Sequence, residues 1–279
     1  MQIAASIAGV DKLVELDENG EIVASYPMND MKLTDRDVVP AGNDEYIGVG
    51  GLASPVQQLV FFRNGEAETI WTKVLPSNER VWDICDALDG FLIIGSTYSS
   101  RERLTLKKVD RKGNTIWEKI YANGVIGEAA ERLEDGSFIV SGERAYSNDP
   151  SSARIWYAHI SATSDILWEK ELSTSPAFVN DMVKCGDGNF ILTGKVNGAV
   201  IPGSVKKGGT DAFLLKINTI GDVIWARNIG SALEDVGYKI RKMTSGDCAV
   251  LGFSRGNSDE VVNPFSDGSM DGWIYRFVD

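Results

Sequence analysis

A short segment of alternating apolar and polar residues recurs along the chain, and each copy leads through a turn into a second strand. Residues 104–117 are the cleanest copy: Asp110 ends the first strand, Gly113 closes the turn and Trp117 lies in the second strand. Further copies are residues 13–24, 59–71, 156–168 and 213–225. Alternation with a period of two on both sides of a glycine turn predicts a β-hairpin.

A second recurrent unit lies between these hairpins. It consists of a charged strand, a tight turn such as Asp135-Gly136, and an apolar strand that closes on a glycine such as Gly142. Its copies are residues 43–50, 89–95, 135–142, 187–194 and 246–252. Asp-Gly suits a tight hairpin turn that needs positive φ, and the closing glycine predicts a place where neighbouring backbones crowd together.

The two units together form a four-stranded module that repeats along the chain. The equivalent turn positions Gly20, Gly65, Gly113, Ser164 and Gly221 are spaced by 45, 48, 51 and 57 residues. This period is close to the ~40–50 residues of a propeller blade. The sequence therefore predicts an all-β fold, a β-propeller of four-stranded blades that occupies residues 1–279 as a single domain.

The number of blades follows from grouping the expected strands. Residues 35–74, 80–120, 127–172 and 178–228 would form four full blades, which leaves three strands at each end of the chain. Six blades, two of them short, is the preferred count, with five and seven as alternatives. The short terminal blades would leave strand edges unpaired, so we expect them either to contact each other or to be completed by another chain.

The repeat resembles that of a family of bacterial secreted and cell-surface β-propeller proteins. The resemblance is carried by Asp-x-x-Gly-x-x-x-Trp, as in residues 110–117, and by Asp-Gly-x-aromatic-Ile-x-x-Gly, as in residues 135–142. The repeat is also similar to the tryptophan-docking repeat of pyrroloquinoline-quinone-type (PQQ-like) propellers. The resemblance implies an extracellular address, at the cell surface or secreted, and a structural, blade-to-blade packing role for Trp117, Trp168 and Trp225.

The quinone cofactor does not carry over, because those enzymes resemble an eight-bladed ring with adjacent cysteines. Here Cys85, Cys185 and Cys248 are far apart in the sequence, and we expect them to be small buried hydrophobic residues. No organic cofactor is expected.

Charge and hydropathy narrow the possible partners and locations. The formal charge of −12 repels phosphate backbones and anionic lipid surfaces, so neither nucleic acid nor membrane insertion is expected. The first nine residues lack a basic segment and a long apolar run, so they do not form a signal peptide. The chain would be cytoplasmic unless a targeting segment has been removed.

His159 is the only histidine in the sequence, and it occupies the repeat position that Lys108, Lys216 and Arg276 fill in other copies. We expect this position to be polar and to face solvent. Histidine-based catalysis is disfavoured, because such chemistry usually needs a second partner.

Acidic residues recur in and just before the charged strand that would line the channel of a propeller. These candidate binding residues are Asp35, Glu79, Asp83, Glu128, Asp181 and Asp235. They could converge to bind a cation or to act as an acid/base pair, or they could cap turns and keep a solvated rim charged.

Two long loops, residues 195–211 and 253–271, interrupt the later blades. Long loops in compact domains tend to be functional, and their Val, Ile and Phe residues would suit a contact with protein or glycan. The second loop offers oxygen ligands for a possible Ca²⁺ site: Asp259, Asn263, Asp267 and Asp271.

Three functions remain open from the sequence. The favoured one is a non-catalytic binding or structural propeller that contacts protein or glycan through its loops. The first alternative is a carboxylate-based carbohydrate-active enzyme at the channel mouth. The second is an oligomer building block that self-associates through its incomplete terminal blades.

Overall fold

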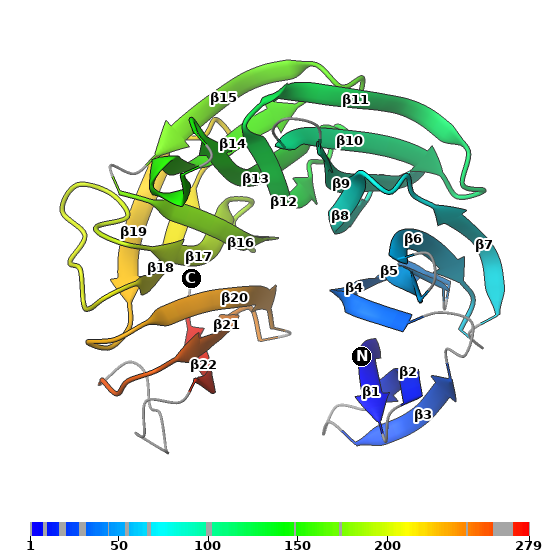
Figure 1. The fold of residues 1–279 in the computed structure, drawn as a ribbon, viewed down its shortest axis with the longest axis horizontal. Coiled ribbons are helices and arrows are strands. Elements are labelled where there is room, and N and C mark those ends of the chain that lie inside the picture. The colour runs from blue at the N-terminus through cyan, green and yellow to red at the C-terminus, as the bar shows by residue number, and fades with distance from the viewer. Residues whose placement is uncertain are drawn as a thin grey trace. The chain divides into compact units, whose positions relative to one another are not determined.

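Tight turns and alternating strands produce a succession of antiparallel sheets in the computed structural model (Figure 1). The structure describes the chain apart from residues 1, 8–9, 17–20, 28–31, 44, 54–55, 66–67, 99–101, 148, 173–174, 244, 259–269 and 279. The chain divides into two compact units, Met1–Ile120 and Tyr121–Asp279. Within each unit, consecutive strands pair with their neighbours in sequence, as expected for propeller blades.

The first unit contains three sheets. Its strands are β1 (Gln2–Ile7), β2 (Val10–Leu16), β3 (Ile22–Pro27), β4 (Lys32–Gly42), β5 (Glu45–Ala53), β6 (Val56–Arg63), β7 (Thr69–Val74), β8 (Glu79–Asp86), β9 (Gly90–Tyr98), β10 (Glu102–Asp110) and β11 (Thr115–Asn123), the last of which ends beyond the unit boundary. The sheets are β1–β3, β4–β7 and β8–β11.

The second unit also contains three sheets and one short 3₁₀ helix. Its elements are β12 (Val125–Arg132), β13 (Phe138–Ala145), η1 (Pro150–Ser152), β14 (Ala153–Ile160), β15 (Ile166–Leu172), β16 (Ala177–Lys184), β17 (Phe190–Val196), β18 (Asp211–Ile217), β19 (Val223–Ile229), β20 (Asp235–Lys242), β21 (Cys248–Ser254) and β22 (Asp271–Phe277). The sheets are β12–β15, β16–β19 and β20–β22.

The all-β propeller architecture with four-stranded blades is confirmed. Four sheets have four strands and correspond to the four full groups predicted from the sequence, whereas β1–β3 and β20–β22 have three strands each. The preferred count of six blades is wrong and the alternative of five blades holds, because the two three-stranded sheets at the ends of the chain are not two complete blades.

Four of the five closing glycines lie where the backbone of the first strand presses against the second strand. The first strands of four sheets have a β-bulge opposite this glycine, and in β16 the bulged residue is Asn180. A Cβ atom on Gly194 would lie 1.9 Å from the carbonyl oxygen of Phe178, and Gly142 meets Ile126 at the same distance. The predicted crowding of backbones at the closing glycine is confirmed.

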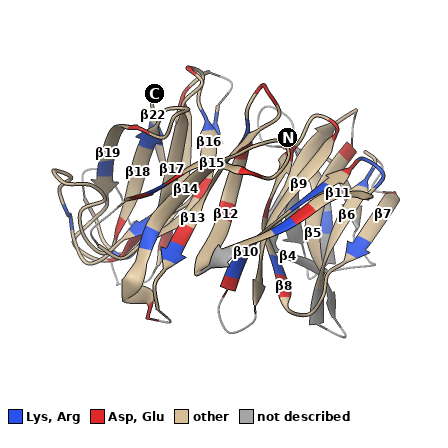
Figure 2. Cartoon of the chain, turned by 90° about the horizontal axis from the view of Figure 1, so that it is seen from above, with Lys and Arg blue, Asp and Glu red and all other residues tan. Residues whose placement is uncertain are grey.

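Side chains fill the space between neighbouring sheets of the same unit. Between β12–β15 and β16–β19, the core contains Tyr157 of one sheet and Phe190, Phe213 and Leu215 of the next, all fully buried. Charged side chains lie mostly outside such cores, and Figure 2 shows basic and acidic positions interspersed on the strands.

Candidate functional site

Strand β10 carries polar side chains at positions that are apolar in the equivalent strands. Thr105 lies opposite the closing Gly95, as Phe213 lies opposite Gly194 in the sheet of β18. Two residues further along, Lys107 therefore takes the position of Leu215. Leu215 is completely buried in its core, and Lys107 is only 7% exposed. A lysine therefore stands where the equivalent strand β18 has a core leucine.

The exchange opens a small cleft in the first unit. The cleft is lined by residues of β8, β9 and β10 and by Leu75 after β7, is partly open to solvent and has room for about one water molecule. Thr105 and Lys107 form its polar wall, and Val81 and Ile93 form its apolar wall. An apolar surface with a few convergent polar groups is typical of a ligand site.

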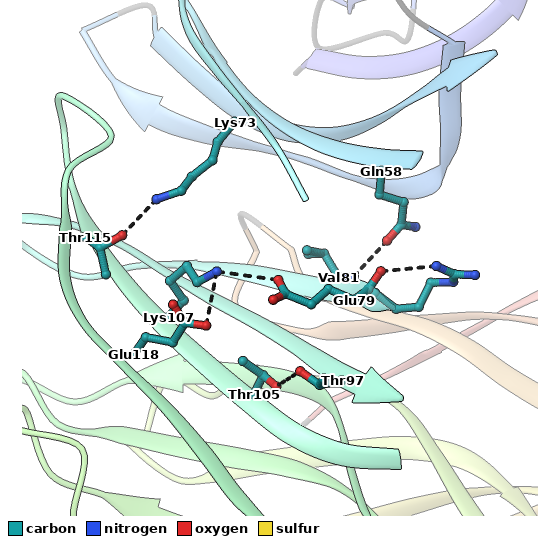
Figure 3. Close-up of polar contacts among 10 residues, drawn as sticks. Gln58, Lys73, Glu79, Val81, Thr97, Thr105, Lys107, Thr115 and Glu118 are labelled. Carbon is teal, nitrogen blue, oxygen red and sulfur yellow. Dashed lines mark hydrogen bonds and ion pairs between the residues drawn. The ribbon is translucent and has the colours of Figure 1, made fainter. Parts of the chain in front are cut away.

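The Lys107 ammonium lies between two carboxylates, as Figure 3 shows. Its Nζ is 3.5 Å from Oε2 of Glu79 and 3.3 Å from Oε1 of Glu118. Charge-assisted hydrogen bonds between nitrogen and oxygen usually measure about 2.7–2.9 Å. The ammonium is thus neutralised by its neighbours but only loosely held by them.

Other polar groups surround the ammonium in well-defined pairs. The hydroxyls of Thr97 and Thr105 lie 2.7 Å apart in the buried part of the site. The indole Nε1 of Trp82 donates to Oγ of Ser96 over 3.0 Å. Val81 donates its backbone N–H to the side chain of Gln58 (Figure 3). These pairs fix the walls of the cleft.

The sequence pointed to one residue of this cleft, Glu79, and missed the lysine. Lys107 was missed because the adjacent Lys108 gives a polar doublet, and the doublet alone does not show which lysine faces the core. The usable signal was the repeat itself: the position of Lys107 is apolar in other copies, as Ala158 and Leu215 show.

The predicted acidic residues occupy different levels of the first strands. Glu79 and Asp235 begin β8 and β20, Asp83 and Asp181 follow the bulges of β8 and β16, and Glu128 lies in the bulge of β12. The side chain of Asp35 lies outside the described residues. In strand register, these carboxylates therefore do not share one level.

Asp181 connects two strands of the second unit. Its Oδ2 accepts from the backbone N–H of Ile240 over 2.9 Å and from Nη1 of Arg241 over 2.6 Å. Nearby, Glu131 accepts from the backbone N–H of Lys184, and burial, together with the charge of Asp181, raises the pKa of Glu131. These carboxylates satisfy edge-strand donors that would otherwise be unpaired.

Asp235 has a related local role in the same unit. It is fully buried, and its Oδ2 accepts from the backbone N–H of Ser231 over 2.6 Å and from the Ser231 hydroxyl over 3.0 Å. The carboxylate thereby holds the turn that leads into β20.

The tryptophans of the outer strands lie against the next sheet where both belong to one unit. The Trp168 indole covers Gly221, where an added Cβ would lie 2.8 Å from the ring, and Trp225 meets Phe277 edge-on with ring centroids 6.3 Å apart. Trp71 covers Gly113 in the same way and donates to the carbonyl of Arg111 over 2.9 Å. Trp117 is half-buried on β11.

The expectation that His159 faces solvent is wrong. Its Nε2 lies 2.7 Å from Oγ of Ser137, and its ring meets that of Trp168 with centroids 5.8 Å apart. Ser137 in turn donates to Asp135. The fourth strand covers this position, and burial lowers the pKa of His159 while Asp135 opposes the shift.

The equivalent lysine in the next sheet makes the same connection directly. Lys216 Nζ lies 2.7 Å from Oδ2 of Asp187. Burial opposes the shift, but the bonds from Lys216 and Asn189 lower the pKa of Asp187 to about 2. The Asp135–Ser137–His159 chain therefore takes the place of a structural ion pair.

The first long loop is held by two buried polar side chains. Asp211 accepts from the backbone N–H groups of Lys207 and Gly208, and Asn228 donates to both Asp211 and the carbonyl of Gly198. The loop still presents Val205 to solvent.

Three of the four candidate calcium ligands, Asp259, Asn263 and Asp267, lie outside the described residues. Asp271 begins β22. The described part of the chain holds no group of three or more His, Cys, Asp or Glu side chains suited to a metal ion. Cys85, Cys185 and Cys248 are free and buried, as expected.

No helix among the described residues is long and apolar enough to span a membrane. No protein-family model matches the chain, and no curated protein matches its sequence.

Several solved structures share the fold. A protein of unknown function from Bacteroides caccae aligns with a TM-score of 0.58 and 12% identity over 89% of this chain and 81% of that one. The Synechocystis apocarotenoid oxygenase, as its Trp149Ala mutant, gives 0.54 and 11% over 90% and 63%. A subtype N10 neuraminidase-like protein of A/little yellow-shouldered bat/Guatemala/060/2010 gives 0.52 and 11% over 90% and 85%. At these identities the similarity shows the fold alone.

Proposed function

We propose that this chain is a non-catalytic binding β-propeller, secreted or presented at a bacterial surface, that takes a glycan into the Lys107 cleft. The observation that supports this proposal is the state of Lys107. Lys107 is only 7% exposed at the wall of the cleft, and the contacts of its ammonium to carboxylate oxygens measure 3.3 and 3.5 Å. A buried ammonium with long contacts gains from an additional oxygen acceptor.

The charges around the cleft favour a neutral ligand. Lys107 faces Glu79 and Glu118, so an anionic group that approached it would meet two carboxylates as well. Sugar hydroxyls avoid this conflict because each can accept from the ammonium and donate to a carboxylate or to a threonine hydroxyl. The cleft has room for little more than one water molecule, so it suits a single hydroxyl group at the edge of a sugar ring.

The first long loop offers a separate candidate contact surface, in the second unit. The loop anchored by Asp211 presents Val205, which is 68% exposed. A rigid loop with an exposed apolar side chain loses little conformational entropy on binding.

A carbohydrate-active enzyme is the alternative, because two carboxylates flank the cleft. Glycoside hydrolysis uses one carboxyl group as the acid and a second as base or nucleophile. Here Glu79 and Glu118 both contact the same ammonium, which favours a binding role over an acid/base pair.

The test is binding of the purified chain to a panel of neutral oligosaccharides, measured by calorimetry and by tryptophan fluorescence. We expect at least one sugar to bind and Lys107→Leu to weaken it by about tenfold or more. Lys108→Gln is the matched control, because Lys108 pairs with Asp89 outside the cleft and its loss should leave affinity unchanged.

Two results would overturn the proposal. One is binding that Lys107→Leu leaves intact, and the other is a failure of every neutral sugar to bind. Release of new reducing ends from a bound oligosaccharide would establish the enzyme alternative instead.

A further inference from the structure

The long loop between β17 and β18 begins with an asparagine-glycine pair, Asn197-Gly198 (Figure 1). Asn197 is exposed, and both residues lie at a bend just after the end of β17. Glycine has no Cβ atom, so the peptide nitrogen that follows the asparagine is sterically open and its backbone is free to turn. In such a pair the nitrogen can attack the carboxamide carbon of the preceding side chain.

The groups that this reaction needs are arranged around the Asn197 carboxamide. The nucleophile is the backbone nitrogen of Gly198, whose N–H has no hydrogen-bond partner in the part of the chain that the structure describes. The carboxamide oxygen, Oδ1, accepts from the Thr210 hydroxyl over 2.9 Å. A donor at this oxygen stabilises the negative charge that develops there during attack. The leaving nitrogen, Nδ2, makes no hydrogen bond to any described residue.

A second asparagine-glycine pair, Asn64-Gly65, has different surroundings. It lies in the turn between β6 and β7. Oδ1 of Asn64 accepts from the backbone N–H of Glu68 over 2.9 Å, and its Nδ2 donates to Oε2 of Glu68 over 2.9 Å. Both ends of this carboxamide are held, so turning it toward the glycine nitrogen breaks two hydrogen bonds. The Asn197 carboxamide is held at its oxygen alone.

We propose that Asn197 is a site of spontaneous deamidation through attack by the Gly198 nitrogen. A bond forms between that nitrogen and Cγ of Asn197, and the bond from Cγ to Nδ2 breaks. Nδ2 leaves as ammonia, together with the proton of the glycine N–H, and a cyclic succinimide remains. Water then adds to one of the two carbonyl carbons of the ring and gives either aspartate or isoaspartate at position 197.

The modification acts on the anchor of the loop. The buried Asn228 donates from Nδ2 to the carbonyl of Gly198 over 2.7 Å, and its Oδ1 accepts from the backbone N–H of Val200 over 3.2 Å. Isoaspartate routes the backbone through the side chain and adds a methylene group ahead of Gly198. The two bonds of Asn228 cannot both keep their geometry, so residues 198–209 become more mobile.

The test is peptide mapping by mass spectrometry while the folded chain is incubated at mildly alkaline pH, with chromatography to separate isoaspartate from aspartate. We expect position 197 to deamidate about tenfold or more faster than position 64, because reaction at Asn64 first breaks two hydrogen bonds. In the chain unfolded in guanidinium chloride, both pairs lose their surroundings and should react at similar rates. Hydrogen exchange in residues 198–209 should be faster in the molecules that carry isoaspartate.

The variant Thr210→Val tests the role of the hydroxyl, because it keeps the shape of the side chain and the backbone carbonyl that accepts from the N–H of Asp235. It should slow the reaction at position 197 about threefold or more and leave position 64 unchanged. Equal rates at the two positions in the folded, unmodified chain would overturn the proposal. A Thr210→Val chain that deamidates at the unmodified rate or faster would overturn it as well.

Discussion

The space between β12–β15 and β16–β19 and the space between β4–β7 and β8–β11 have the same construction and different contents. In the first, Phe213 and Leu215 fill the core completely. In the second, Thr105 and Lys107 stand at the same positions of the repeat and border an open cleft. Each pair begins opposite a closing glycine, so the backbone is held alike in both sheets.

The comparison indicates how the proposed binding site could arise in a repeat fold by an exchange of side chains alone. The bulge, the closing glycine and the strand pairing stay, because they do not depend on the residues that face the neighbouring sheet. Polar residues at core positions of one module then mark that module for function.

The largest effect is expected from moving the lysine to the filled space. Leu215→Lys would bury an ammonium among apolar side chains and should lower the free energy of unfolding by about 4 kcal/mol, or prevent folding. The reverse change, Lys107→Leu, should alter it by less than about 1 kcal/mol, since Glu79 and Glu118 stay partly exposed to water. Urea denaturation of both variants measures the asymmetry, and equal losses would contradict it.

The next largest effect on stability is expected from removing the tryptophans of the outer strands, which cover the edges of the cores between sheets. Trp168→Ala and Trp225→Ala remove aromatic rings that cover the next sheet, so each should lower the free energy of unfolding by about 3 kcal/mol. We expect the same of Trp117→Ala from its place in the repeat. Urea midpoints provide the measurement, with Trp168→Phe as a milder control. If all three alanine variants unfold like the unmodified chain, the tryptophans do not hold the sheets together.

A smaller effect is expected from filling the open space. Thr105→Phe introduces the residue that stands at this position in β18, but it leaves the buried Thr97 hydroxyl without its partner and should lower the free energy of unfolding by about 1 kcal/mol. The same change should abolish sugar binding. A gain in stability would contradict this prediction, and retained sugar binding would place the ligand elsewhere.

The smallest effect is expected on the pH dependence of stability. It distinguishes His159, which contacts the turn between β12 and β13, from Lys216, which contacts the turn between β16 and β17. Burial lowers the pKa of His159, so the unfolded chain binds this proton first as pH falls. Stability from this group is complete above the unfolded value of about 6.5 and decreases as pH falls from there toward the lowered folded value. His159→Lys restores the ion pair seen at Lys216 and should remove this component. Melting temperatures at pH 7.5 and 5.5 provide the comparison, and an identical pH dependence of both proteins would refute the role of His159.

The strands and turns were predictable because their signals are local. Asp110 and Gly113 predict a turn without any information from distant residues. Asp110 accepts from two backbone N–H groups, and Gly113 has a positive φ of 81°. The repeat also gave the grouping into four full blades. The blade count was harder to predict, because a group of three strands can be counted either as a short blade or as part of a blade.

The site was predictable only in part, because it depends on which face of a strand meets a neighbour. Lys107 and Lys108 look alike in the sequence, yet one lines the cleft and the other pairs with Asp89. His159 was assigned to solvent from the charge of its equivalents. The fourth strand of the sheet places Trp168 against His159, and the alternating pattern of the sequence does not show this contact.

The bulge and its closing glycine lie within one sheet, as with Asn180 and Gly194, whereas neighbouring sheets of a unit meet through side chains. The two layers of construction are therefore separable. A gene segment that encodes one blade could be duplicated or exchanged with its internal geometry intact, and only the side chains at its two faces would need to adapt. After duplication of such a segment, substitutions at positions such as 105 and 107 would be enough to change the binding specificity of one blade. The other blades would keep their packing unchanged.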